Sequence, residues 1–220
     1  RKSKLFRLHY CFDMGKLSDR RLAVLAGYLH FLGTSKYTPT EIQQAFYRLG
    51  ASFGAECRDE HFFFSLTGLE ESFEEAVALM EHLLADAQPN PEAMENLVAD
   101  ILLRRENNKK DKRTILSKGL ANYAKHGPVN PFSDKLNAEQ LHALLPSDLT
   151  DLLNGLRFFQ HEVFYFGAKN ASKVGAILKK HHAVLEAFKK PLPAHKYPEI
   201  GTKKDKVYFV NFPSVQIELL

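Results

Sequence analysis

The chain contains little cysteine, no tryptophan and no long apolar run. Cys11 and Cys57 are the only cysteines among 220 residues, too few for a disulfide framework or a cysteine-rich zinc site, although a single bridge between them stays open. No run of about 18 or more apolar residues occurs, so the sequence predicts no membrane segment. The chain begins at Arg1 without an apolar signal stretch, as expected of a fragment, and its compartment, cytoplasmic or periplasmic, stays undecided.

The chain also lacks a strong charge of either sign. Thirty basic residues oppose 26 acidic ones, a balance that gives no reason to expect a nucleic-acid partner. The most basic stretch, RRENNKKDKR at 104–113, also carries two acidic residues and is typical of a solvated helix end or loop. Neither GxxxxGK[ST] nor GxSxG occurs, which argues against a P-loop nucleotide site and a serine hydrolase.

What the chain does contain is an ordered series of strand and helix patterns. FRLHYCF at 6–12 alternates apolar and polar residues and predicts a half-buried strand. SFGAECR at 52–58 and HFFFSLT at 61–67 alternate in the same way, and they should pair as an antiparallel hairpin around Asp59 and Glu60.

Helices are predicted between these strands and after them. Leucines at 22, 25, 29 and 32 recur at helical spacing after Ser18, which can serve as the N-cap. The later helix starts have capping signals of their own, which are Thr38 with Glu41, Ser72 with Glu75, Asn90 with Pro91, Asn137 with Gln140, and Ser147.

The C-terminal part predicts one more strand and one more helix. EVFYFGA at 162–168 is continuously apolar and is interpreted as a central strand, followed by a helix over 170–188. Because strands and helices alternate while the hairpin requires antiparallel pairing, the predicted class is α+β, with a mixed, largely antiparallel sheet and helices packed mainly on one face. We expect a domain at 1–188, a Pro- and Lys-rich linker at 189–206, and at 207–220 the first strand of a following domain.

The order of these elements and several strings resemble the insulinase and pitrilysin-like zinc metallopeptidases, also called the inverzincin or mitochondrial-processing-peptidase family. The resemblance runs from Leu5 to Phe188 and covers close to one domain of that family, the LuxS and processing-peptidase type. The strings that carry it are FLGT at 31–34, GASFGAECRDEHFFFSL at 50–66, NPF at 130–132, SDLTDLL at 147–153 and EVFYFGA at 162–168.

The zinc motif of that family is degenerate in this sequence. Active members carry H-x-x-E-H on the first helix, two histidine ligands and a glutamate that activates the metal-bound water. Alignment on the FLGT turn places Val24 and Tyr28 at the histidines and Gly27 at the glutamate, and no catalytic or metal-binding group remains. The third ligand would fall near Arg104, where Glu106 is the nearest carboxylate.

The resemblance therefore implies a non-catalytic domain that encloses and aligns extended peptides for a zinc site on another domain or subunit. It implies a catalytic metallopeptidase half and a peptide substrate as partners, and zinc as the cofactor of that half only. It places a substrate-contacting Arg and Tyr beyond Leu220. The alternative is a structural or assembly scaffold of the same family without a peptidase role.

Other polar residues are interpreted as structural. Glu81 and His82 in ALMEH are predicted to be surface residues, since Ala78 replaces the first ligand of a zinc motif. His182 and Glu186 are four residues apart but lack a third ligand, and a basic helix end explains them more simply. His30 is predicted to be a partly buried helix residue, Cys57 a core residue, and Cys11 a residue on the polar face of its strand.

Overall fold

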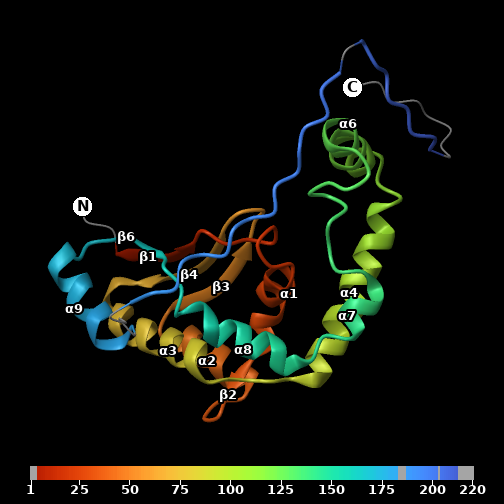
Figure 1. Cartoon of the computed structure of the whole chain (residues 1–220). Helices are drawn as coiled ribbons and strands as arrows, with labels where there is room; N and C mark the ends of the chain where they lie inside the picture. Colours follow the sequence, from red (N-terminus) through yellow and green to blue (C-terminus); the bar gives the residue numbers. More distant parts are fainter. Residues whose placement is uncertain (1–3, 183–186, 203, 213–220) are drawn as a thin grey trace.

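The computed structural model describes residues 4–182, 187–202 and 204–212. Its main sheet has four strands in the order β3 (Ala51–Cys57), β4 (Phe62–Leu69), β1 (Leu5–Phe12) and β6 (Glu162–Phe166), and all neighbours are antiparallel. Two short strands, β2 (Gly33–Thr34) and β5 (Ala87–Gln88), pair separately. The antiparallel sheet and its accompanying helices confirm the α+β class (Figure 1).

Helices α2, α3 and α8 lie along one side of the sheet, whereas α4 to α6 extend away from it (Figure 1). The helical segments are α1 (Arg21–Tyr28), η1 (Leu29–Phe31), α2 (Pro39–Arg48), η2 (Glu70–Ser72), α3 (Phe73–Asp86), α4 (Pro91–Asn108), α5 (Lys112–Thr114), the π-helical η3 (Ile115–Leu120), α6 (Ala121–His126), α7 (Ala138–His142), α8 (Pro146–Leu156) and α9 (Ala171–His181). None of the helices within the described ranges is long and apolar enough to span a bilayer.

The core forms where the alternating strands turn their apolar side chains toward the helices. On β1 these are Phe6, Leu8, Tyr10 and Phe12, none of which is more than 1% exposed. Every second residue of β4 from Phe62 onward is buried as well. A strand with this period of two has one face toward the core and one toward solvent, and the sequence pattern predicted this correctly.

Several predicted helix starts are confirmed by their hydrogen bonds. Thr38 and Glu41 form a reciprocal capping box, and Asn137 and Gln140 form another. The Asn90 side chain accepts from the Ala93 amide at the start of α4. Each of these bonds satisfies an amide that lacks a helical partner.

Three predicted caps are wrong. Ser147 lies inside α8, which begins at Pro146 after the N-cap residue Leu145. Ser72 makes no capping bond, because the 3-10 turn η2 runs directly into α3 and keeps Ser72 out of the extended conformation that an N-cap needs. Ser18 is not an N-cap, since α1 begins at Arg21, and the buried Ser18 hydroxyl has no hydrogen-bond partner among the described residues.

The C-terminal strand and its surroundings also differ from expectation. β6 is an edge strand rather than a central one, and its apolar run is exposed, with Phe164 at 51% and Phe166 at 70%. α9 ends at His181 instead of 188. Residues 207–212 form no strand, and the alternating residues 215–219 lie outside the described residues. The boundaries proposed between domain and linker stay predictions.

The unit made of β6 and α9 is held to the rest of the domain by Glu70. Its carboxylate accepts from the Tyr165 hydroxyl (2.6 Å), the Ala168 amide and the Lys169 ammonium (2.9 Å). Burial alone would raise the pKa of Glu70, but these hydrogen bonds and the charge of Lys169 hold the pKa below its ordinary value. The carboxylate is therefore bound in its ionised form.

Replacing Glu70 with glutamine should lower the free energy of unfolding by about 1–3 kcal/mol, because an amide cannot accept equally from all three donors. A group with a lowered pKa contributes stability above its ordinary pKa and loses it as the pH falls. Denaturant unfolding between pH 3 and pH 7 should show this loss below about pH 4.5 in the parent chain and a weaker loss in Glu70→Gln. The exposed Glu71→Gln variant should behave like the parent.

Candidate functional site

A groove of about 550 Å³ lies at the position of the degenerate zinc motif. Its three walls come from α1 with η1, from β3 and from α4, and we call it the α1–β3–α4 groove. The residues that define it are Ala23, Ala26, Gly27, His30, Ala55, Glu56, Cys57, Leu97, Ile101, Arg104 and Asn108. Its lining mixes polar and apolar surface in nearly equal parts, with the apolar part contributed by residues such as Leu97 and Ile101.

The three motif positions on α1 serve packing. Val24 is buried in the core. Gly27 faces Leu97 of α4, and a Cβ atom added at Gly27 would lie 3.3 Å from the Leu97 Cδ1. A side chain at position 27 would therefore require the Leu97 side chain to shift slightly.

Tyr28 joins α1 to the beginning of α4. Its hydroxyl donates to the Asn90 carbonyl (2.9 Å) and accepts from the Asn90 amide (2.7 Å). The side chain is fully buried, and burial raises the pKa of Tyr28. The position where the family carries a second zinc ligand thus holds two helices together.

The α4 side of the groove also lacks an available carboxylate. Arg104 lines the groove and pairs with Asp100 at 2.6 Å. Glu106, the nearest carboxylate to the expected third ligand, pairs with Lys109 at 2.6 Å and lines a different cavity. Among the residues with described positions, no three His, Cys, Asp or Glu side chains converge to hold a metal ion.

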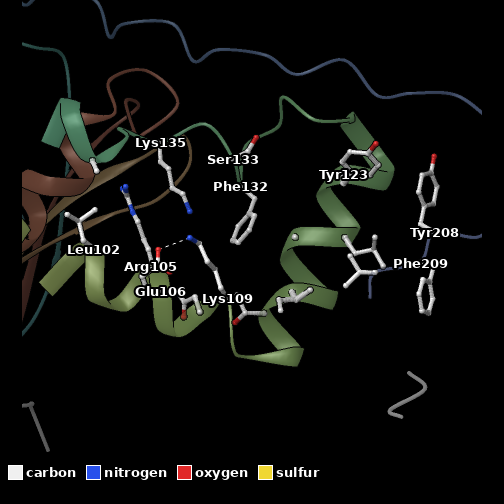
Figure 2. Close-up of a pocket in the computed structure, with 17 residues that line it drawn as sticks. Leu102, Arg105, Glu106, Lys109, Tyr123, Phe132, Ser133, Lys135, Tyr208 and Phe209 are labelled. Carbon is white, nitrogen blue, oxygen red and sulfur yellow. Dashed lines mark hydrogen bonds and ion pairs between the residues drawn. The ribbon is translucent and has the colours of Figure 1, made fainter. Parts of the chain in front are cut away.

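That second cavity, of about 830 Å³, lies along the C-terminal half of α4 and the segments that follow it. Figure 2 shows Phe132 beside the basic groups of Lys109 and Lys135, whereas Tyr123 and Phe209 lie at the opposite end of the lining. The Arg105 guanidinium donates to the Leu136 carbonyl (2.5 Å). Within the stretch interpreted as solvated, Arg105 therefore has a structural role that composition did not indicate.

The β3 wall of the groove is the open edge of the sheet. Arg58 donates its amide to the His61 carbonyl, and in an antiparallel ladder the residues that bond to the partner strand alternate. The register then directs the amides and carbonyls of Glu56 and Gly54 toward β4. Those of Ala55 and Cys57 point outward along the groove, where another extended chain can pair with them.

Three predictions about side-chain burial are wrong. His30 is exposed and lies in the 3-10 segment η1, with its ring above Gly54 at the rim of the groove. Cys11 is buried, whereas Cys57 is only half-buried. The alternation of β1 fails at Cys11 because both faces of the strand are covered there. Both thiols are free, and burial raises the pKa of Cys57 to about 11, so Cys57 is a poor nucleophile.

Glu81 and His82 are not surface residues. The Glu81 side chain is 11% exposed and bonds to Tyr10 and His182. His82 lies 3.0 Å from the Thr34 hydroxyl. His182 is 8% exposed, so a solvated basic helix end does not describe it, and Glu186 lies outside the described residues. The spacing of His182 and Glu186 gave no signal for these contacts, because the partners of His182 are distant in sequence.

Comparison with known proteins places the chain in a family. Residues 21–130, half of the chain, match the Insulinase (Peptidase family M16) family. The protein is therefore a member of the insulinase family, peptidase family M16, as the resemblance predicted. No curated protein sequence matches it.

Solved structures share its fold. The periplasmic protease PqqL from Escherichia coli superposes with a TM-score of 0.74 at 10% identity, covering 91% of this chain and 23% of PqqL. A protease from Helicobacter pylori superposes with a TM-score of 0.69 at 13% identity, covering 90% of this chain and 50% of that protease. A peptidase M16 inactive domain from Pseudomonas fluorescens superposes with a TM-score of 0.68 at 18% identity, covering 87% of this chain and 49% of that chain. This chain thus spans between about a quarter and a half of those chains.

The Tyr28→Phe substitution should lower the free energy of unfolding by about 1–2 kcal/mol, because it leaves the backbone amide and carbonyl of Asn90 without their partner. Denaturant unfolding at neutral pH measures this loss. Tyr47→Phe is the matched control, since Tyr47 is 83% exposed. Equal stability of the two variants would contradict the role given to the Tyr28 hydroxyl.

Proposed function

We propose that this chain is a non-catalytic domain of a zinc metallopeptidase that encloses and aligns extended peptides for cleavage at a zinc site on another domain or subunit. The outward-facing edge of β3 along the groove carries this proposal. Family membership and the absence of ligating groups at Val24, Gly27 and Tyr28 support it. These side chains do not fit a zinc ion, so no chemical step is assigned to the groove.

Peptide binding by strand addition needs few specific side chains. A peptide that pairs with β3 exchanges main-chain hydrogen bonds with Ala55 and Cys57, and these bonds are independent of the peptide sequence. Its side chains then alternate between the groove and the solvent. Leu97 and Ile101 offer the groove-facing side chains a hydrocarbon wall, and Arg104 offers a charge near one side. The domain would thus align many peptides with modest preference.

Ala55→Pro tests this mode of binding in the complete protein. Proline removes an outward amide without breaking the ladder to β4. Loss of one or two main-chain bonds, about 1.4 kcal/mol, should raise the KM for peptide hydrolysis about tenfold and leave kcat nearly unchanged.

Val163→Pro is the matched control on the opposite edge. Glu70 accepts no bond from this residue, and the pairing of β1 with both neighbours directs the Val163 amide outward from β6. This variant should keep the parental KM. An unchanged KM in Ala55→Pro, or an equal rise in both variants, would contradict strand addition at β3.

Zinc content separates this function from the scaffold alternative. We expect stoichiometric zinc and peptide hydrolysis in the complete protein and neither in residues 1–220 alone, measured by plasma emission and a peptide assay. Stoichiometric zinc in the 220-residue chain would mean that the assignment of Val24, Gly27 and Tyr28 to the motif is wrong. Absence of zinc and activity from the complete protein would favour a structural or assembly scaffold.

A further inference from the structure

Four polar side chains from four parts of the chain form a hydrogen-bonded cluster between β1, α3 and the ends of β6 and α9. The Tyr10 hydroxyl of β1 donates to Oε1 of Glu81 on α3 (2.7 Å), and the same oxygen lies 2.8 Å from Nδ1 of His182 at the end of α9. Nε2 of His182 lies 3.0 Å from Nε2 of His161, which directly precedes β6. Nδ1 of His161 lies 2.8 Å from the Phe159 carbonyl oxygen. We call these four side chains the Glu81 cluster.

The hydrogen bonds fix the number of protons in the Glu81 cluster. A carbonyl oxygen only accepts, so Nδ1 of His161 carries a hydrogen. An ionised Glu81 also only accepts, so Nδ1 of His182 carries one as well. Two neutral rings in these tautomers would direct bare Nε2 lone pairs at each other across 3.0 Å. One additional proton converts this repulsive contact into an N–H···N hydrogen bond.

The proton count does not depend on where that proton resides. If Glu81 holds it, the carboxylic acid donates to Nδ1 of His182, whose Nε2 then carries the hydrogen donated to His161. In both arrangements the cluster contains one proton more than an ionised carboxylate and two neutral imidazoles. In both arrangements its net charge is zero, which a buried site requires in the absence of another charge.

No neighbouring charge among the described residues replaces that proton. The Tyr10 hydroxyl stays un-ionised, because burial and the charge of Glu81 raise its pKa. The His161 ring packs against Phe12 and Phe188, with ring centroids 4.7 and 5.6 Å away. The adjacent Glu162 is exposed.

Two further charged segments flank the cluster. The Lys189 ammonium lies over the Phe159 ring, 5.9 Å from the ring centroid. On α9, Lys180 and His181 both contact Glu74 in the first turn of α3, at 2.7 and 3.3 Å. A second additional proton is disfavoured, since burial lowers the pKa of His161. The cluster is therefore built for one additional proton.

We infer that the Glu81 cluster is a single-proton site that fastens the β6–α9 unit to β1 and α3, and that loss of this proton in alkaline solution releases the unit. His161 and His182 stand at the two ends of the unit, whereas Tyr10 and Glu81 belong to the body of the domain. Without the proton, the facing lone pairs and a buried uncompensated carboxylate favour separation.

The sign of the pH dependence follows from the proton counts. Above pH 7.5, the released unit has two neutral histidines and an ionised glutamate, so it lacks the additional proton. The fastened unit holds that proton. Fastening then takes up a proton, and the opening equilibrium constant rises about tenfold for each pH unit. Toward acid, the lowered pKa of His161 weakens fastening as well, so the unit is held best near neutral pH.

Hydrogen–deuterium exchange of the complete protein tests this inference between pH 6.5 and 9. After correction for the intrinsic exchange rate, peptides covering 162–166 and 171–181 should show the tenfold rise per pH unit above 7.5, while the α2 peptide at 39–48 should not. In Glu81→Gln the amide N–H can donate to Nδ1 of His182, whose Nε2 then carries the hydrogen donated to His161. This cluster is neutral without an additional proton, so the pH dependence should disappear. The exposed Glu75→Gln is the matched control and should keep it.

Three results would overturn the inference. The first is a pH-independent opening of the β6 and α9 peptides in the parent protein, which decides the matter even if Glu81→Gln does not fold. The second is an unchanged pH dependence in a folded Glu81→Gln protein. The third is slower exchange with added Zn²⁺, together with loss of the pH dependence after chelation, which would assign the two Nε2 atoms to a metal ion instead of a proton.

Discussion

The packing of β1 is the constraint on which the rest of this domain depends. β1 pairs with β4 on one side and β6 on the other, so it joins the N-terminal hairpin to the C-terminal unit. Its buried face carries Phe6, Leu8 and Phe12, whose contact with the helices supplies the hydrophobic stabilisation. The same face carries Tyr10, whose hydroxyl must find an acceptor once it is buried. The Glu81 cluster is thus a consequence of placing a tyrosine in the core.

The first helix shows how a family fold persists without its chemistry. Zinc ligands that stabilise a site also hold helices in place, and in this chain Tyr28 and Leu97 join α1 to α4 without a metal ion. Gly27 leaves room for Leu97, so the helices approach closely where a glutamate would need space. The groove between these helices therefore has an open strand edge as its third wall.

Much of the fold was predictable from local patterns. The alternation in 6–10 and the capping box of Thr38 with Glu41 depend on neighbours within a few residues, and both were predicted correctly, whereas the alternation fails at Cys11. β6 was misplaced because a continuous apolar run gives no information on the number of neighbouring strands. Glu81 was misassigned because its partners, Tyr10 and His182, lie 71 and 101 residues away. The alignment located the groove, but the outward direction of the Ala55 amide required the register.

The two edges of the sheet have different physical characters, and this difference bears on function. β3 presents outward amides beside the two other walls of the groove, α1 with η1 and α4. β6 is short and exposed, with a buried hydrogen-bonded anchor near each end, Glu70 and Glu81. A short edge with fixed ends is a poor template for a long peptide. Under the proposed function, an extended peptide would therefore pair with β3 rather than with β6, and β3 lines the same groove as the helix that carries the degenerate motif.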